Sequence, residues 1–253
     1  MCTLVILFQP DTRWPLIMAG NRDEMRDRPA MPPAQHWPAQ PAVTAGLDQL
    51  GGGTWLGMNQ YGVVASIMNR EGTLGPLAGK KSRGDLVLQA LQHTSAEAAQ
   101  RAMGALAADA YRAFNLFIGD RTQGFWLRSQ DHGENSRLEC FEIEPGLHML
   151  TSRELDDVSH PRIRHWLPRF RSATPPRPEQ QSWQAWRALL SARSAGDPAT
   201  PHAAMNMDLP GGFATVSSSL IALPRSPGQD DPVWLYADGA PDQAEFVPIN
   251  VAS

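Results

Sequence analysis

This 253-residue sequence contains few cysteines and tyrosines, and its net charge is small. Its two cysteines, Cys2 and Cys140, cannot form a disulfide framework and are typical of a reducing compartment, so we expect a cytoplasmic protein. The formal charge of -4 shows no basic excess. Nucleic acid is therefore not an expected partner, because binding to its phosphates needs clustered positive charge.

Long hydrophobic runs are absent as well. The first apolar run, residues 3–8, is too short to span a bilayer, so neither a signal peptide nor membrane insertion is expected. Histidines and cysteines do not follow the spacing of metal sites, so we expect no dedicated metal site. With 42% hydrophobic residues the chain can bury a sizeable core, and nothing resembles a linker. We therefore expect one domain over residues 1–253.

Apolar segments predict strands in two main runs, with pairs of helices between and after them. The expected strands are 3–8, 15–19, 41–45, 53–58, 62–68, 113–119, 124–128, 138–143, 147–152, 213–223, 233–237 and 245–249. The proline-rich residues 29–41 predict an irregular, solvent-facing crossing. This order favours antiparallel sheets faced by helices over regular βαβ alternation, so the fold class is α+β.

Cys2 is the first candidate for chemistry. If the initiator Met1 is removed, Cys2 carries a thiol and a free α-amine on the same carbon. An α-amine titrates near pKa ~8 and a thiol near ~8.5, so one group can act as base for the other, as in an N-terminal nucleophile. The alternative is a cysteine that simply packs at the start of a buried strand.

The second predicted strand runs into a charged cluster, Asn21-Arg22-Asp23-Glu24. A hairpin that starts at Cys2 brings this cluster back beside the first residues. Arg22 could lower the pKa of the thiol or hold a substrate carboxylate, and Asp23 could orient the terminal amine. Neighbouring residues on a strand face opposite ways, so both can reach Cys2 only if the strand ends at the cluster. A solvated strand end is the alternative.

Asn69 closes a later strand pair. A carboxamide near a nucleophile can donate to a developing oxyanion, although Asn69 could equally be a turn residue.

Taken together, these residues resemble the NRDE family, which includes the transport and Golgi organisation protein 2. The segments that carry the resemblance are Cys2-Thr3, Asn21-Arg22-Asp23-Glu24, Gly53-Thr54-Trp55-Leu56-Gly57, the strand to Asn69, Arg83-Gly84, Phe114-Asn115-Leu116, Gly119-Asp120 and Glu144-Pro145-Gly146. A more distant pattern is similar to cysteine N-terminal nucleophile hydrolases of the choloylglycine and penicillin V acylase type. It implies their four-layer αββα sandwich.

Carried over residue by residue, the resemblance implies four catalytic positions. They are the nucleophile Cys2, its neighbour Arg22, the aspartate Asp23 that holds the nucleophile, and the oxyanion residue Asn69. The resemblance also places a set of residues around the ligand pocket, namely Asn21, Glu24, Trp55, Asn115 and Ser152.

The hydrolases separate their Arg and Asp by two residues, whereas Arg22 and Asp23 are adjacent here, and the sequence departs from these families at two further positions. Ser152 stands where an Asn usually follows Thr or Ser, and Val216 stands where an Arg is usual. A less polar pocket beside the thiol suits a hydrophobic ligand better than a charged transition state.

Three functions stay open. Because family members are implicated in moving haem, the resemblance implies first a protein that binds and traffics a small hydrophobic ligand, haem above all, as releasable cargo and not as a required cofactor. The alternative is an amidohydrolase that uses Cys2 as nucleophile. A third possibility is a docking surface for other proteins, built from some of the eight tryptophans.

Overall fold

The computed structural model describes residues 2–130 and 137–252. The chain forms two compact units, the first from Met1–Arg28 and Pro145–Ile249, the second from Pro29–Glu144 and Asn250–Ser253. The single domain over residues 1–253 stays a prediction. The chain passes from unit 1 to unit 2 and back, and such interleaved units need not be separate folding domains.

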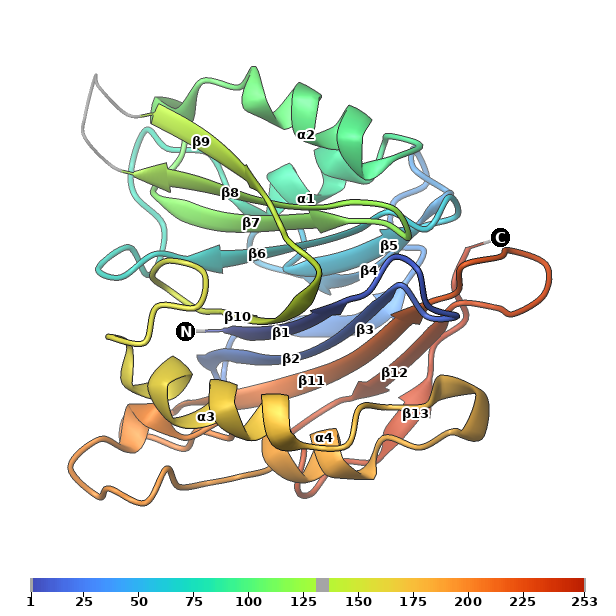
Figure 1. Cartoon of the computed structure of the whole chain (residues 1–253). Helices are drawn as coiled ribbons and strands as arrows, with labels where there is room; N and C mark the ends of the chain where they lie inside the picture. The colour runs from blue at the N-terminus through green and yellow to red at the C-terminus, as the bar shows by residue number, and fades with distance from the viewer. Residues whose placement is uncertain (1, 131–136, 253) are drawn as a thin grey trace. The chain divides into compact units, whose positions relative to one another are not determined.

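Unit 1 is built on an antiparallel sheet in the order β10-β1-β2-β11-β12-β13 (Figure 1). Its strands are β1 (Thr3–Phe8), β2 (Leu16–Met25), β10 (Gly146–Leu150), β11 (Phe213–Leu223), β12 (Val233–Ala237) and β13 (Phe246–Pro248). Every residue of β1 is buried, as its uninterrupted apolar sequence predicts. The long strand β11 pairs with the whole of β2 and so forms the middle of the sheet.

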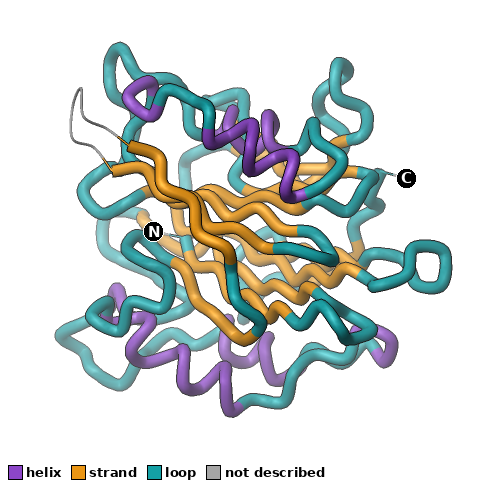
Figure 2. The backbone as a smooth tube through the Cα atoms, turned by 45° about the horizontal axis from the view of Figure 1, so that its top comes forward, coloured by secondary structure: helices purple, strands orange, loops and turns teal. Residues whose placement is uncertain are grey.

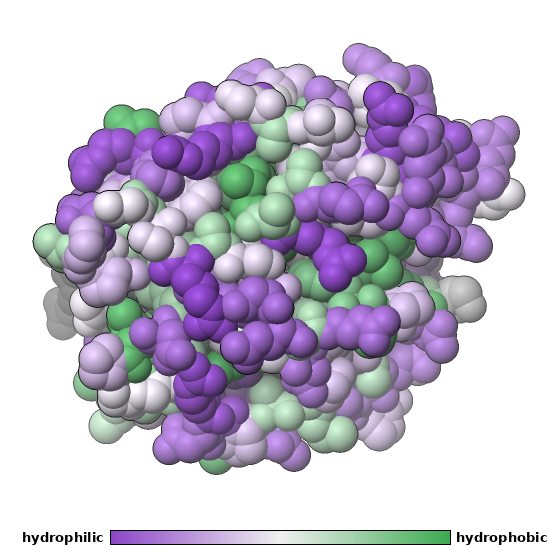
Figure 3. All heavy atoms as spheres, turned by 90° about the horizontal axis from the view of Figure 1, so that it is seen from below, coloured by the Kyte–Doolittle hydropathy of each residue, from purple (hydrophilic) through white to green (hydrophobic). Residues whose placement is uncertain are grey.

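Helices α3 (Pro161–Ser172) and α4 (Gln184–Leu190) lie on one face of this sheet. Figure 2 shows them as separate turns outside the strands. Short 3-10 turns at Pro178–Gln180 and Pro201–Ala203 complete this layer. The apolar side of α3 packs on alternate residues of β1, β2 and β11. Its other side is polar, and Figure 3 shows many hydrophilic residues on the face seen from below.

Unit 2 is built on a second antiparallel sheet in the order β3-β4-β5-β6-β7-β8-β9. Its strands are β3 (Ala30–Ala34), β4 (Val43–Asp48), β5 (Leu56–Asn59), β6 (Val64–Asn69), β7 (Phe114–Gly119), β8 (Gly124–Gln130) and β9 (Arg137–Glu142). Helices α1 (Gly84–Ala90) and α2 (Ala96–Gly104), with a 3-10 turn at Ala108–Ala110, cover one of its faces.

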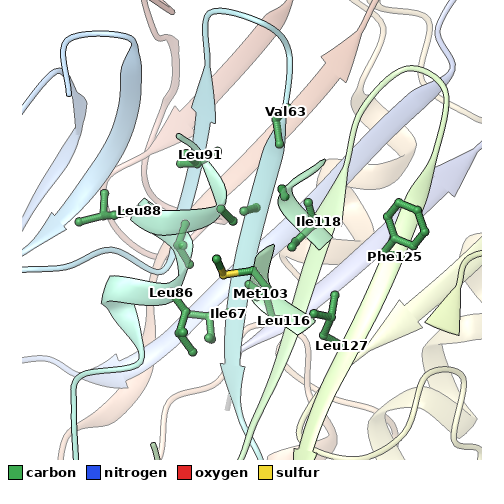
Figure 4. Close-up of a cluster of buried hydrophobic side chains, with 14 of the residues drawn as sticks. Val63, Ile67, Leu86, Leu88, Leu91, Met103, Leu116, Ile118, Phe125 and Leu127 are labelled. Carbon is green, nitrogen blue, oxygen red and sulfur yellow. The ribbon is translucent and has the colours of Figure 1, made fainter. Parts of the chain in front are cut away.

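The core of unit 2 lies between these helices and the sheet. Figure 4 shows Leu86 and Leu91 of the α1 segment and Met103 of α2 gathered against Leu116 and Leu127 from the strands. The alternation along β7 and β8 explains this core, because every second side chain of a strand faces the helices.

Residues 29–41 were expected to form an irregular crossing. This prediction is wrong for the first half of the segment, which contains strand β3 (Ala30–Ala34). Strand β3 pairs with β4, with a register shift between Met31 and Ala34. It lies at the edge of the sheet, where a missing N–H is tolerated, so Pro32 and Pro33 do not prevent pairing.

Candidate functional site

Strand β2 does not end before the charged cluster but runs through it to Met25. Asn21 lies opposite Thr3 of β1 and Ser218 of β11. The expectation that the strand ends at the cluster is wrong, because β11 is long enough to supply pairing partners for the entire segment. Neighbouring members of the cluster therefore face opposite sides of the sheet.

The carboxylate of Asp23 is buried beneath helix α3. Arg162 Nη1 donates to Asp23 Oδ2 at 2.7 Å, and both side chains are 0% exposed. Thr215 Oγ1 donates to the other oxygen, Oδ1, at 2.6 Å. Arg162 also donates to Thr3 Oγ1 and to the carbonyl of His202. Asp23 thus holds β1, β2, β11 and α3 together.

Asn21 lies two residues before Asp23, on the same face of β2, and makes a similar connection. Its Nδ2 donates to the carbonyls of Leu190 and Met205 at 3.0 and 2.9 Å, and Ser218 Oγ donates to its Oδ1 at 2.6 Å. These three bonds tie β2 to the end of α4, to Met205 and to β11, so the side chain of Asn21 is engaged within the unit.

Cys2 lies half-buried at the start of β1. Continuing the pairing of Thr3 with Asn21 by one residue puts it opposite Arg22. Burial raises the pKa of the Cys2 thiol, and the Asp23 carboxylate acts in the same direction. A backbone hydrogen bond from Asp23 and the Arg22 guanidinium lower this pKa. The structure therefore brings Cys2, Arg22 and Asp23 together.

A β-bulge in β11 separates the two charged neighbours of Cys2. Thr215 pairs with Asp23 and Ser217 pairs with Arg22, so Val216 is the extra residue. In a regular strand Thr215 and Ser217, two residues apart, would face the same side of the sheet. The bulge lets Thr215 bond Asp23 on the helix side and places Ser217 beside Arg22 on the other side.

Glu24, expected in the ligand pocket, lies farther from Cys2 along β2. Its side chain is 25% exposed, accepts from the backbone N–H of Met25 and lies 3.8 Å from Arg28 Nε. Ser152, also expected there, is buried just after β10 in the same unit.

The other expected site residues belong to unit 2. Asn69 ends β6 and lies opposite Phe114, while Asn115 is fully buried and its Oδ1 accepts from Arg70 Nη1 at 2.9 Å. The Trp55 ring lies over Gly46, where an added Cβ would come within 2.3 Å of Cη2. Their roles as oxyanion donor and pocket residues stay predictions.

Arg162 and Thr215 are structural partners of the site that the sequence analysis missed. The sequence could have indicated that Arg162 is buried. It lies four and eight residues before Trp166 and Phe170, which places it on the apolar side of α3. A charged residue on an apolar helix face indicates a buried partner. The bulge that brings Thr215 to Asp23 had no such signal.

Residues 2–130 and 137–252 contain neither a metal-binding cluster nor a membrane-spanning helix. No group of three or more His, Cys, Asp or Glu side chains is placed to hold a metal ion. No helix in this part of the chain is long and apolar enough to cross a bilayer.

A family model described as Transport and Golgi organisation 2 matches residues 1–221. The chain belongs to this family. A family member from Bos taurus, Transport and Golgi organization protein 2 homolog, is 29% identical over 165 residues, or 62% of this chain and 58% of that protein. The Homo sapiens homolog is 30% identical over the same shares of both chains. The aligned segment thus spans less than two thirds of these relatives.

Solved structures identify the fold of this Transport and Golgi organisation 2 family member. Penicillin V acylase from Agrobacterium tumefaciens matches 98% of this chain and 86% of its own, with a TM-score of 0.55 and 12% identity. A variant of conjugated bile acid hydrolase from Clostridium perfringens matches 100% and 94%, with a TM-score of 0.56 and 12% identity. The predicted α+β fold of the N-terminal nucleophile hydrolases is confirmed.

Proposed function

We propose that this chain hydrolyses an amide bond with Cys2 as its nucleophile. The observation that carries the proposal is the place of Cys2 just before β1, where the strand register continues to put it opposite Arg22 of β2. The Arg22 guanidinium lowers the pKa of the Cys2 thiol, against the rise that burial causes. Support comes from the fold, which the chain shares over 98–100% of its length with a penicillin V acylase and a conjugated bile acid hydrolase. At such low identity the fold itself does not fix the reaction.

The chemistry begins with removal of Met1, which lies outside the described residues. The α-amine of Cys2 then takes the thiol proton, and the sulfur attacks the carbonyl carbon of the amide. The tetrahedral intermediate collapses to a thioester as the amine product leaves with a proton. Water hydrolyses the thioester and restores the free thiol. Asn69 is the expected oxyanion donor.

Asp23 has a positioning role in this proposal. Its side-chain oxygens accept from Arg162 and Thr215, which fixes the backbone of β2. The N–H of that backbone supports the developing charge on sulfur. Burial raises the pKa of the thiol, so a proton acceptor on the same residue is needed to generate the nucleophile.

The first experiment is a hydrolysis assay on the full chain with Met1 removal verified by intact mass. Its probes are penicillin V, a glycine-conjugated bile acid and an N-acylethanolamine. We expect turnover of at least one probe, loss of turnover in Cys2→Ala, and retention in the matched control Cys140→Ala. Turnover that survives Cys2→Ala, or a folded, Met1-free chain inactive on all three probes, contradicts the proposal.

The second candidate function is the binding and carriage of a small hydrophobic ligand, with haem as the expected cargo. The raised pKa of the Cys2 thiol favours it, because a buried neutral thiol suits an apolar ligand better than a charged transition state. Hemin titration of the full chain tests it. A saturable Soret change at micromolar protein supports carriage, and its absence together with no transfer to an apo-acceptor removes it.

A further inference from the structure

The first residue of β1, Thr3, has a strand partner on one side only. It pairs with Asn21 of β2, whereas pairing with β10 begins one residue later, at Leu4 opposite Leu150. Cys2 comes one residue earlier still. The ends of a chain are poorly ordered unless strand pairing or side chains tie them down. A nucleophile at this place therefore gains from an anchor beyond the sheet itself.

Arg162 of α3 supplies such an anchor through Thr3. Its Nη1 donates both to Thr3 Oγ1 and to Asp23 Oδ2, so one nitrogen joins the residue next to Cys2 to the neighbouring strand. The Arg162 side chain is 0% exposed, and Thr3 is buried as well. Hydrogen bonds shielded from water in this way are stronger than exposed ones.

Arg162 is itself held from two directions. Its backbone N–H donates to Nδ1 of the N-cap residue His160 at 3.2 Å, and its Nη2 donates to the carbonyl of His202 at 3.1 Å. The next turn of α3 is held to the same segment, because Trp166 Nε1 donates to the carbonyl of Ala203 at 2.7 Å. Thr3 is thus tied to a helix end that several other bonds fix.

Stability alone does not favour an arginine at this position. Arg162 lies in the first turn of α3, where the helix dipole disfavours a positive charge. Burying its ion pair with Asp23 also costs desolvation, and apolar residues of similar volume often stabilise a protein equally well. A role in fixing the position of another group accounts for the arginine.

We propose that Arg162 positions the Cys2 sulfur by holding Thr3 against Asp23. Arg162 is a positioning residue, because it acts through Thr3 from the helix-covered face of the sheet (Figure 1). Continuing the alternation of β1 by one residue puts the Cys2 side chain on the other face. The catalytic part of the proposal rests on the proposed function, whereas the anchoring of Cys2 does not.

Alkylation by iodoacetamide, followed on the full chain by peptide mapping, tests the anchoring. Burial is the main cause that raises the pKa of the Cys2 thiol, so a loosened chain start exposes the sulfur and returns this pKa toward its ordinary value. At pH 8 we expect Cys2 to react about three- to tenfold faster in Thr3→Val, which removes the accepting hydroxyl and keeps the side-chain shape. Thr3→Ser keeps the hydroxyl and is expected to react at the wild-type rate.

Three comparisons separate the anchor from other effects. Cys140 of β9, in unit 2, keeps its alkylation rate if the loosening is local. Thr44→Val removes another buried threonine hydroxyl that accepts a backbone N–H, and leaves the Cys2 rate unchanged. Arg162→Met, once shown to be folded, speeds Cys2 alkylation at least as much as Thr3→Val does, and adding Thr3→Val to it has no further effect.

The catalytic readout is turnover. In Thr3→Val we expect kcat to fall about tenfold with KM unchanged, because a loosened nucleophile is poorly aligned with a substrate that still binds. An unchanged kcat in this variant of an active chain overturns the catalytic part of the proposal. A chain that hydrolyses no probe, while Thr3→Val still speeds Cys2 alkylation, refutes the proposed function and leaves the anchor standing.

The anchoring is overturned by any of three results. They are a wild-type Cys2 alkylation rate in Thr3→Val, an equal increase in Thr3→Ser, and an equal increase at Cys140. A folded Arg162→Met that reacts at the wild-type rate also overturns it. If Arg162→Met does not fold, the two Thr3 variants decide.

Discussion

Asp23 and Arg162 form an ion pair with no contact to water, and their contribution at the residue scale can be measured directly. Removing one member leaves an uncompensated buried charge. Asp23→Ala and Arg162→Met are therefore each expected to lower the free energy of unfolding by about 3–5 kcal/mol. Urea denaturation of each variant measures this loss, and the double variant is expected to lose less than the sum.

The matched control is an exposed pair in the same unit. The side chains of Arg193 and Asp242 are 40% and 27% exposed to solvent. Arg193→Met is therefore expected to lower the free energy of unfolding by about 1 kcal/mol or less. Equal losses in Arg193→Met and Arg162→Met would show that Asp23 is not held as the structure describes.

Tyr236 gives a second prediction at this scale, because burial raises its pKa to about 12 in the folded chain. Below pH 10 both the folded and the unfolded forms are protonated. Between pH 10 and pH 12 the unfolded phenol ionises first, so stability falls by up to about 3 kcal/mol. Urea midpoints measured across this range are expected to fall less steeply in Tyr236→Phe. Parallel curves for both proteins would contradict the assignment.

At the scale of elements, Asn59 joins the β5–β6 turn to the segment after α1. Its Nδ2 donates to the carbonyls of Leu91 and His93, and its Oδ1 accepts from the N–H groups of Tyr61 and Val63. Asn59→Ala leaves these groups unpaired at a buried position. We expect a loss of about 2–4 kcal/mol in urea denaturation, since each unsatisfied buried group costs about 1–3 kcal/mol.

Asn206→Ala is the matched control for this prediction, because it removes a buried carboxamide that accepts no bond through Oδ1 in the described residues. Its loss is expected to be smaller. A cost for Asn59→Ala at or below that of Asn206→Ala would contradict the role of Asn59 as a connector.

The strands were largely predictable from sequence, and the irregular features were not. The nearly continuous apolar run of residues 3–8 identified β1, because a strand buried on both faces has few polar residues. The run in β7 is also mainly apolar and is interrupted by Asn115. Strand β3 was missed because its prolines normally end a strand and only its edge position permits them. The bulge at Val216 was missed because a bulge depends on the register with β2, which one strand alone does not reveal.

For the whole molecule, the resemblance carried by Cys2 and residues 21–24 predicted the family and the fold that the comparisons identify. It also predicted that the cluster lies beside Cys2, and the strand register continues to put Arg22 opposite that residue. It did not predict that the Asp23 carboxylate is committed to Arg162, because that pairing joins residues 139 positions apart. Pairings of this kind depend on how α3 docks on the sheet.

The most direct test of the account is to trap the acyl group on the chain. Full chain lacking Met1 is mixed with an N-acyl p-nitroanilide, quenched in acid during turnover and mapped by mass spectrometry. The account predicts the acyl mass on the Cys2 thiol, no adduct in Cys2→Ala and an unchanged adduct in Cys140→Ala. Release of p-nitroaniline with the acyl group on another residue, or without any dependence on Cys2, would contradict it.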